Sequence, residues 1–344
     1  MRISQIMLSK GFGGAERHFV DLTLALVARG HSIQVICNRS FPAPKYLEAT
    51  TGLQIDSITV RGTWDLIASW RIGALLKAFA PDIAHAHLAR AAHLTGRATR
   101  QKSPLLVTNT HNYIKLKYYK YVRGFVVATG AQQSYLTCSG IDTNCIVSIP
   151  HFSRFSDPFS PKRSGGRTFI SLGRLVKKKG FDILLEALSL LRGRGRGIDA
   201  DLVIGGDGCE LLHLMALSKH YKIESNVRFV GWVDVVKDFL LQGDVFVLPS
   251  LDEPFGIVLL EAMATGLPII STTAHGPSEI LSDCSAYMVD PGNSLQLSWA
   301  MQETLERPAE RAGRARNAAL SYGERYTENV VIPQYENFYR ALLK

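Results

Sequence analysis

Two runs of alternating strands and helices, separated by a polar stretch, constrain this chain more than any other feature of its sequence. Short apolar segments such as Ile3–Leu8 and Ser32–Cys37 have the length of buried strands, and Glu16–Arg29 between them has apolar residues at helical spacing. Further strands of the first run are expected at Ile83–Ala86, Leu105–Thr108, Phe125–Ala128 and Cys145–Ile149. Strands that alternate with helices indicate a parallel sheet covered on both faces.

The alternation stops between His151 and Arg167, a stretch with two prolines that is rich in serine, glycine and charge. It resumes with strands expected at Thr168–Leu172, Ala200–Gly205, Val227–Val230, Val245–Pro249 and Pro268–Ser271, and helices at Phe181–Leu191, Cys209–His220, Val235–Leu241 and Ile257–Ala264. The predicted fold class is therefore α/β, with two doubly wound Rossmann-like domains facing a cleft. Residues 1–150 and 168–323 form the domains, 151–167 the linker, and 324–344 a terminal helix for which packing on the first domain is one arrangement.

Composition excludes several classes of protein. With 46% hydrophobic and 20% charged residues, the 344-residue chain is ordinary for a globular protein and not a disordered one. Its most apolar window, Phe255–Ile270, is too short to span a bilayer and contains Glu261. The five cysteines are scattered and form no C-x-x-C pair, which argues against disulfides or a zinc site and favours a reducing cytoplasm.

The net charge of +9 is concentrated in one region. No acidic residue occurs between Asp82 and Asp142, whereas eight bases do: Arg90, Arg97, Arg100, Lys102, Lys115, Lys117, Lys120 and Arg123. We therefore expect an anionic partner near this stretch, namely nucleic acid, an acidic membrane surface or a phosphorylated ligand.

Three loops that directly follow expected strands carry residues suited to phosphates and sugars. In Gly11–Glu16, glycines let the backbone approach a ligand, and the following helix N-terminus attracts an anion; a tight turn without a ligand is the alternative. Gly173–Phe181 places four bases before a helix, where they are unfavourable unless an anion such as a diphosphate is bound; a solvated basic loop is the alternative. In Glu253–Glu261, two carboxylates could bind sugar hydroxyls, or be ordinary structural and solvated groups.

The order and spacing of these segments resemble the family 4 glycosyltransferases, which have the GT-B fold. The resemblance covers almost the whole chain and is strongest between residues 168 and 281. It rests on the Gly-Gly-Ala-Glu-Arg turn, the Gly-Arg…Lys-Lys-Gly-Phe segment, Gly206–Gly208, Val227–Gly231 and the glutamates 253 and 261. The chain departs from the family pattern at Ile149–Phe152, where Ile-Pro-Asn-Gly is common, and at His275–Glu279, where Gly-Gly is common.

The resemblance implies a retaining transferase that moves a hexose from a UDP-sugar, or else a GDP-sugar, to a glycan or lipid-linked acceptor. Synthesis of cell-envelope polysaccharide or lipopolysaccharide is the implied context. The catalytic residues it implies are His111, Glu253, Arg174 and Lys179. The donor-binding residues it implies are Gly13, Gly14, Arg174, Lys179, Phe229, Val230, Glu253, Phe255, Gly256, Ile257 and Glu261.

Each of these residues has an implied role. Gly13 and Gly14 would approach the donor phosphate, and Arg174 and Lys179 would bind the diphosphate and stabilise the leaving group. The backbone of Phe229–Val230 would receive the base. Glu261 would hold the ribose, and Glu253 the donor sugar, together with backbone N–H groups at residues 255–257. His111 matches a family histidine near the donor sugar, whereas His85 and His87, also at a strand end, have weaker claims.

No metal or other cofactor is expected, because two cations can neutralise the departing diphosphate. The one D-x-D sequence, Asp199–Asp201, precedes a strand and therefore lies at the wrong end of a sheet for a ligand. Glu253 and Lys179 both lie in loops, so we expect them to support transfer and not folding.

The segment Tyr113–Arg123 interleaves tyrosines with bases, which suits a membrane–water interface. We expect an anionic membrane surface to be bound by Lys115, Lys117, Lys120 and Arg123. The protein would then be cytoplasmic and peripheral on the inner face of the cytoplasmic membrane; a solvated helix face is the alternative. The competing functions are a sugar-nucleotide epimerase or phosphorylase of the same fold, or a nucleic-acid-binding protein. No familiar nucleic-acid motif is present, so no nucleic-acid partner is expected.

Overall fold

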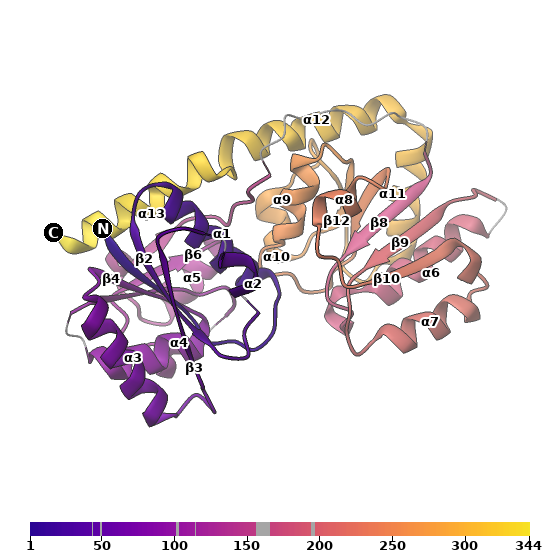
Figure 1. The fold of residues 1–344 in the computed structure, drawn as a ribbon. Helices are drawn as coiled ribbons and strands as arrows, with labels where there is room; N and C mark the ends of the chain where they lie inside the picture. Colours follow the sequence, from indigo (N-terminus) through magenta and orange to yellow (C-terminus); the bar gives the residue numbers. More distant parts are fainter. Residues whose placement is uncertain (43, 49, 101–102, 114, 156–165, 194–196) are drawn as a thin grey trace. The chain divides into compact units, whose positions relative to one another are not determined.

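The chain leaves its first folded unit after Arg154 and returns to it at Glu328 (Figure 1). In the computed structural model, unit 1 comprises residues 1–154 and 328–344, and unit 2 comprises residues 155–327. The structure describes residues 1–42, 44–48, 50–100, 103–113, 115–155, 166–193 and 197–344. His151 and Phe152, at the start of the expected linker, are buried in unit 1, and residues 156–165 of that linker lie outside the described residues.

Unit 1 is built on a seven-stranded parallel sheet with the order β3-β2-β1-β4-β5-β6-β7. Its strands are β1 (Arg2–Met7), β2 (Ser32–Asn38), β3 (Leu53–Ile58), β4 (Ile83–His87), β5 (Leu105–Asn109), β6 (Gly124–Val127) and β7 (Ile146–Ser148). Its helices are α1 (Gly14–Ala28), α2 (Pro44–Leu47), α3 (Leu66–Phe79), α4 (Leu88–Thr99), α5 (Gly130–Cys138) and α13 (Glu328–Leu343), with short 3-10 turns η1 (Leu116–Tyr118) and η2 (Thr143–Cys145).

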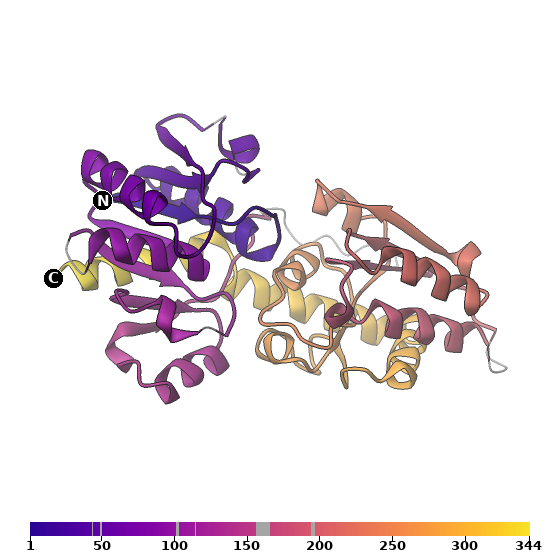
Figure 2. The same cartoon turned by 90° about the horizontal axis from the view of Figure 1, so that it is seen from below.

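The two faces of this sheet are covered by different helices (Figures 1 and 2). Apolar side chains of α1 and α13 pack with Ile3 and Ile83 on one face, whereas those of α3, α4 and α5 pack with Ile6 and Ala84 on the other. Because side chains alternate along a strand, His85 and His87 lie on the same face as Ile83. The sequence Ile-Ala-His-Ala-His therefore presents two histidines to α1 and α13.

Unit 2 contains a six-stranded parallel sheet with the order β10-β9-β8-β11-β12-β13. Its strands are β8 (Thr168–Leu172), β9 (Asp201–Gly205), β10 (Val227–Gly231), β11 (Val245–Leu248), β12 (Ile269–Thr272) and β13 (Tyr287–Val289). Its helices are α6 (Phe181–Arg192), α7 (Leu211–His220), α8 (Val236–Leu240), α9 (Ile257–Ala264), α10 (His275–Ile280), α11 (Ser294–Glu306) and α12 (Pro308–Arg325), with 3-10 turns η3 (Lys177–Lys179) and η4 (Glu224–Asn226). Helices α6, α7 and α11 cover one face of the sheet.

The predicted α/β fold class with two doubly wound sheets is confirmed. Two strands were not expected: the edge strand β3, which carries polar Gln54 and Asp56, and the three-residue strand β13. In the basic segment Tyr113–Arg123, the described residues form the 3-10 turn η1 and no α-helix; Ile114 lies outside the described residues. Among the described helices, none is both long enough and apolar enough to cross a membrane.

Candidate functional site

In each sheet the strand order reverses at one place, and the loops that follow the strands on either side of it are where doubly wound proteins bind ligands. The reversal lies between β1 and β4 in unit 1 and between β8 and β11 in unit 2. The loop after β8 contains Arg174 and Lys179, and the loop after β11 contains Glu253. These predicted residues therefore lie where a ligand is expected in unit 2.

Glycines set how closely the loops of unit 2 approach one another. Gly206 has φ +125°, and a Cβ there would collide with the carbonyl oxygen of Gly173. Gly180 has φ +65°, and a Cβ there would collide with the carbonyl oxygen of Pro249. Backbone hydrogen bonds complete the contact, since Leu251 donates to Lys178 O at 2.8 Å. The loop after β8 is thus held directly against the loop after β11.

This contact brings two predicted catalytic side chains together. Lys179 Nζ forms an ion pair with Glu253 Oε2, and both side chains are largely buried. Ser250 Oγ donates to the same carboxylate oxygen at 3.4 Å. Beside them, Lys178 and Asp252 form an exposed ion pair at 3.2 Å. The mutual pairing changes the expectation that Glu253 and Lys179 serve only transfer, because removing one leaves the other's charge buried.

The remaining predicted residues of this loop pair lie around the ion pair. Arg174 is exposed and forms no ion pair with any residue that the structure describes, so its guanidinium is open to an anion. Phe255 is buried, and Gly256 is the N-cap of α9, with Ile257 as the first helical residue. Glu261 lies within α9 and is 6% exposed.

The predicted base-binding residues Phe229 and Val230 lie on the edge strand β10. The pairing register of β10 with β9 shifts between Phe229 and Gly231, which leaves Val230 without a partner residue. Such a bulge interrupts the regular ladder and bends the strand. Val230 therefore has no residue opposite it on β9, whereas Phe229 and Gly231 do.

In unit 1, Gly13 and Gly14 begin helix α1, with Gly13 as its N-cap. Gly13 has φ −160°, a conformation open to any residue, and a Cβ there would meet only Glu16 Oε2, at 3.4 Å. Neither backbone conformation nor packing within unit 1 therefore requires a glycine at this position. A ligand that approaches the turn closely would require one.

His111 lies in a cluster of five buried histidines, which we call the histidine cluster: His18, His85, His87, His111 and His151. The His111 ring stacks on that of His151, with centroids 5.1 Å apart, and its Nε2 lies 3.2 Å from His87 Nδ1. The rings of His18 and His151 are 4.2 Å apart. The sequence indicated three of the five from their strand ends; His18 and His151 were missed.

Helix α13 and two amides complete the cluster. Tyr339 Oη is 2.6 Å from His85 Nδ1, and Asn109 Oδ1 is 2.7 Å from His85 Nε2. Tyr335 Oη is 3.1 Å from His18 Nε2 and accepts a hydrogen bond from Asn109 at 2.9 Å. The last helix of the chain therefore contributes two tyrosines to a site whose histidines all come from residues before 152.

Hydrogen bonds specify which nitrogen of His111 carries a proton. Gln5 Oε1 lies 2.8 Å from His87 Nε2, so His87 donates from Nε2 and accepts at Nδ1. His111 is then the donor from Nε2, and its Nδ1 is left with a lone pair. Among the described residues, no hydrogen-bond partner reaches His111 Nδ1. This relay of hydrogen bonds from Gln5 through His87 thus leaves His111 Nδ1 buried, with a lone pair that accepts no hydrogen bond from a described residue.

Burial holds the whole cluster neutral. Desolvation, followed by the neighbouring imidazoles, lowers the pKa of His18, His87 and His111 well below 6.5. Desolvation lowers the pKa of His85 and of His151 to about 3. At neutral pH the cluster can therefore accept hydrogen bonds but carries no charge to attract an anion.

The described residues include no group of three or more His, Cys, Asp or Glu side chains placed to hold a metal ion. The imidazoles of the histidine cluster stack on one another instead of converging on a point. Asp199 pairs with Arg192, and Asp201 begins strand β9, at the opposite end from Gly205.

The four predicted membrane-contacting bases, Lys115, Lys117, Lys120 and Arg123, are all exposed. Lys117 Nζ lies 5.1 Å from the centre of the Tyr118 ring, and Lys120 Nζ 5.7 Å from that of Tyr121. Lys115 differs from the others because it lines a cavity in unit 1. Two other bases of that cavity, Lys10 and Arg90, were not predicted as site residues.

Both units of the chain match models of glycosyltransferase families. Residues 153–321 match the family described as "Glycosyl transferases group 1", and residues 12–150 match the family described as "Glycosyltransferase Family 4". The lipopolysaccharide core biosynthesis glycosyltransferase LpsD of Rhizobium meliloti (strain 1021) is 28% identical over 331 residues, which cover 94% of each chain.

Solved structures share the two-sheet fold. Anabaena HepE, in a complex with UDP-glucose, superimposes with a TM-score of 0.85 at 18% identity, over 99% of this chain and 100% of that chain. The lipopolysaccharide outer core galactosyltransferase WaaB, in its apo form, superimposes with a TM-score of 0.77 at 18% identity, over 98% of each chain.

Proposed function

Because the chain belongs to glycosyltransferase family 4, we propose that it transfers a hexose, with retention of the anomeric configuration, from a UDP-sugar to an acceptor of the cell envelope. The observation that carries this proposal is the ion pair Lys179–Glu253 beside Arg174, which forms no ion pair with a described residue, at the reversal of strand order in unit 2. Cations bind a diphosphate strongly, and a carboxylate can accept hydrogen bonds from sugar hydroxyls.

The departing diphosphate would be stabilised by Arg174 and Lys179. As the sugar–phosphate bond breaks, negative charge grows on the diphosphate and positive charge on the sugar, and fixed cations lower the barrier by neutralising the former. Glu253 holds Lys179 in place, so little reorganisation is needed when the donor arrives. The same carboxylate can accept hydrogen bonds from sugar hydroxyls.

The base and the ribose would be bound by neighbouring elements. The backbone of Val230, at the register shift of the edge strand β10, would offer hydrogen-bonding groups to a base, and UDP is favoured over GDP because HepE has been solved with UDP-glucose. Glu261 would bind the ribose hydroxyls. His111, with its free lone pair at Nδ1, would accept a hydrogen bond from the donor sugar.

The acceptor is proposed to be a glycan or glycolipid of lipopolysaccharide. LpsD is named for lipopolysaccharide core biosynthesis, and WaaB for galactose transfer to the outer core. Such acceptors are attached to lipid, so we propose that the protein is cytoplasmic and works at the inner face of the cytoplasmic membrane.

An apolar ridge supports membrane contact. At the start of α3, Trp64, Leu66, Ile67 and Trp70 are all exposed, with 72% of Trp70 accessible. The ring centroids of Trp64 and Tyr118 are 6.2 Å apart, and Lys117 contacts the same tyrosine ring, so this ridge lies beside Lys117. Exposed tryptophans next to bases suit the interface of an anionic bilayer. The ridge therefore adds an apolar contact to the electrostatic one predicted from the basic segment.

The donor is tested by incubating the purified protein with UDP-, GDP- and ADP-sugars and measuring hydrolysis, transfer and thermal stability. We expect UDP to raise the melting temperature and a UDP-sugar to be consumed, with the product anomer identified by NMR. Stabilisation by DNA or RNA but by no nucleoside diphosphate would contradict the proposal and favour nucleic-acid binding. Interconversion of the sugar without transfer would favour an epimerase.

Membrane contact is tested by flotation with vesicles of phosphatidylglycerol and phosphatidylcholine. We expect binding that weakens as salt rises and is lost in Lys117→Glu/Lys120→Glu and in Ile67→Ser/Trp70→Ser. Leu212→Ser/Trp299→Ser, which removes exposed apolar side chains from unit 2, is the matched control and should float like the wild type. Equal binding to purely neutral vesicles would refute the electrostatic contact.

A further inference from the structure

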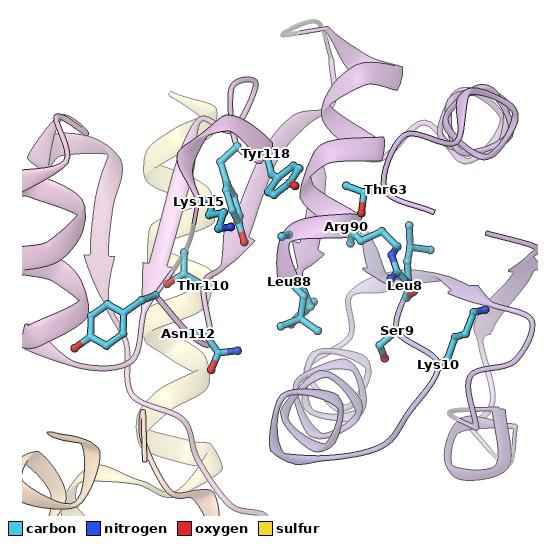
Figure 3. A pocket seen from close by; sticks show the side chains of 15 residues that line it. Leu8, Ser9, Lys10, Thr63, Leu88, Arg90, Thr110, Asn112, Lys115 and Tyr118 are labelled. Carbon is cyan, nitrogen blue, oxygen red and sulfur yellow. Dashed lines mark hydrogen bonds between the residues drawn. The ribbon is translucent and has the colours of Figure 1, made fainter. Parts of the chain in front are cut away.

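A cavity of about 530 Å³ opens at the reversal of strand order in unit 1. Its lining comes from the segment after β1, the start of α4 after β4, and the segment after β5, with Thr63 from the segment after β3 (Figure 3). This is the position at which doubly wound sheets bind ligands. The predicted donor contacts Gly13 and Gly14 do not line it, so these contacts do not account for the cavity.

Three cations line this cavity. Lys115 lies on one side, next to Tyr118, and Arg90 and Lys10 lie on the other (Figure 3). None of the three forms an ion pair with a described residue, and no carboxylate is among the lining residues. With three cations and no carboxylate, the lining gives the cavity a positive potential that attracts an anion.

Arg90 combines a fixed side chain with an unsatisfied donor. Its Nη1 donates to the carbonyl oxygen of Leu8 at 3.1 Å, which fixes the side chain against the loop after β1. Its Nε is buried without a hydrogen-bond partner among the described residues. A buried donor without a hydrogen bond destabilises the folded protein by about 1–3 kcal/mol. An oxyanion in the cavity would satisfy it.

The backbone adds to the positive potential. Residues Leu88 to Ala91 line the cavity and form the first turn of α4, whose N–H groups have no partner within the helix. Leu88 has φ +69°, a left-handed conformation that is strained for a leucine. The chain thus turns sharply where β4 passes into α4, at the edge of a cavity that already contains three cations.

Polar and aromatic groups complete the lining. Asn112 and Thr110 supply amide and hydroxyl groups, and Tyr118 supplies a ring on which a sugar can pack. Tyr118 also contacts Trp64 of the apolar ridge, with ring centroids 6.2 Å apart. The cavity therefore combines an anion-binding wall with a sugar-binding one, and it borders the surface that we assign to the membrane.

We propose that this cavity binds a phosphoryl group carried by the acceptor, and so selects phosphorylated acceptors. This inference rests on the proposed function only in calling the ligand an acceptor. Arg90 and Lys115 bind the phosphoryl oxygens with the first turn of α4, while Asn112 and Tyr118 contact the adjoining sugar or headgroup. Lys115 thus belongs to the acceptor site, and Lys117 and Lys120 to the membrane surface.

The test is calorimetric titration of the whole protein with its donor site saturated by UDP. The probes are mannose 6-phosphate with mannose as its uncharged counterpart, and dihexanoyl phosphatidic acid with dihexanoyl phosphatidylcholine. Lys10→Gln/Lys115→Gln removes two cavity cations, and Lys219→Gln/Lys222→Gln removes the same charge from exposed positions of unit 2. We expect at least one phosphate probe to bind the wild type and the second variant equally, and the first variant about tenfold or more weakly.

The pattern of binding identifies the source of the phosphate. Binding of the sugar phosphate alone supports a phosphorylated sugar, and binding of the lipid phosphate alone supports a phospholipid headgroup. Failure of both probes, or equal weakening in the two variants, would overturn the proposal. UDP affinity is measured in each variant, so loss of the donor function would be recognised separately from loss of the phosphate site.

Discussion

The two units share a fold and differ in how they keep polar groups beneath their ligand-binding loops. Unit 1 contains seven of the ten histidines, and five of them form the buried, neutral histidine cluster. Unit 2 contains three, His213, His220 and His275, all exposed, and instead buries the ion pair Lys179–Glu253. A doubly wound sheet thus allows either solution at the carboxyl ends of its strands.

This difference follows from what each unit is proposed to bind. Unit 2 would hold a diphosphate, so a permanent cation is needed there, and a carboxylate keeps that cation in position. In unit 1 the cations line the cavity. The buried histidine cluster beneath the loops is uncharged and only donates and accepts hydrogen bonds. Under these proposals, charge is buried where a leaving group would be stabilised and kept at the surface where an acceptor would be recognised.

The largest effect should be a difference in acid stability between the units. The pKa of each clustered histidine is lower folded than unfolded, so only the unfolded chain gains protons as pH falls below about 6.5. Each histidine would then lower the free energy of unfolding by about 2 kcal/mol between pH 7 and 5, and the five together by about 10 kcal/mol, which is comparable to the stability of a domain. We expect unit 1 to unfold near pH 5 while unit 2 persists. Peptide-resolved hydrogen exchange at several pH values measures this, and simultaneous loss of protection in both units would contradict it.

The next effect is on turnover and tests the ion pair of unit 2. Lys179→Ala should lower kcat about a hundredfold or more, because a transition-state cation is lost, and should also destabilise unit 2 by leaving Glu253 unpaired. The double variant Lys179→Met/Glu253→Gln should recover the melting temperature but not the turnover. A double variant as unstable as Lys179→Ala would show that the pair is not coupled in the folded state.

A smaller effect, about tenfold in kcat, is expected from His87→Phe. That change keeps an aromatic ring in the stack but removes the acceptor of the hydrogen bond from His111 Nε2, so both tautomers of His111 become populated. Affinity for UDP should not change. Nitrogen NMR of labelled imidazoles reads the tautomer directly; a wild-type His111 protonated at Nδ1 would be incompatible with the relay from Gln5.

The smallest effect should come from Arg29→Ala, which removes a partner of Glu336 on α13. The Arg29 guanidinium, more than other groups, lowers the pKa of Glu336 to about 2. That stabilisation is present above about pH 4.5 and lost towards pH 2, below the range in which the histidines would already unfold unit 1. At pH 7 we expect a fall of one or two degrees in melting temperature, because Arg29 is exposed and His31 still binds Glu336 at 2.8 Å. A fall of ten degrees would mean that α13 depends on this contact.

Much of the fold was predictable because the central strands of a parallel sheet are buried on both faces and read as short apolar runs. Segments such as Ile3–Leu8 and Val245–Pro249 were recognised for that reason. Strand β3 was not recognised, because polar Gln54 and Asp56 interrupt its apolar pattern, as in a loop. Strand β13 was not recognised because it has only three residues. Both omissions lie away from the reversals of strand order, so they left the ligand-binding positions unaffected.

The candidate site was predictable only where its residues come from one loop. Glu253 and Lys179 were named from local motifs, but their ion pair was not, because it depends on how closely Gly180 lets two loops approach. The histidine cluster joins residues up to 133 positions apart, from His18 to His151. A histidine on the apolar side of a helix, as His18 is, was the one signal that could have suggested it.

The return of the chain to unit 1 has a consequence for the order of events on the ribosome. Residues 1–154 emerge first, but Tyr335 and Tyr339, which the histidine cluster uses as hydrogen-bonding partners, are separated from them by the whole of unit 2. During synthesis, the part of the first sheet's apolar face that α13 covers, with the histidines bonded to its tyrosines, must therefore stay exposed while a complete second unit is translated. Unit 2, whose residues are contiguous, can finish folding first, so the half of the protein that begins the chain is the half that matures last.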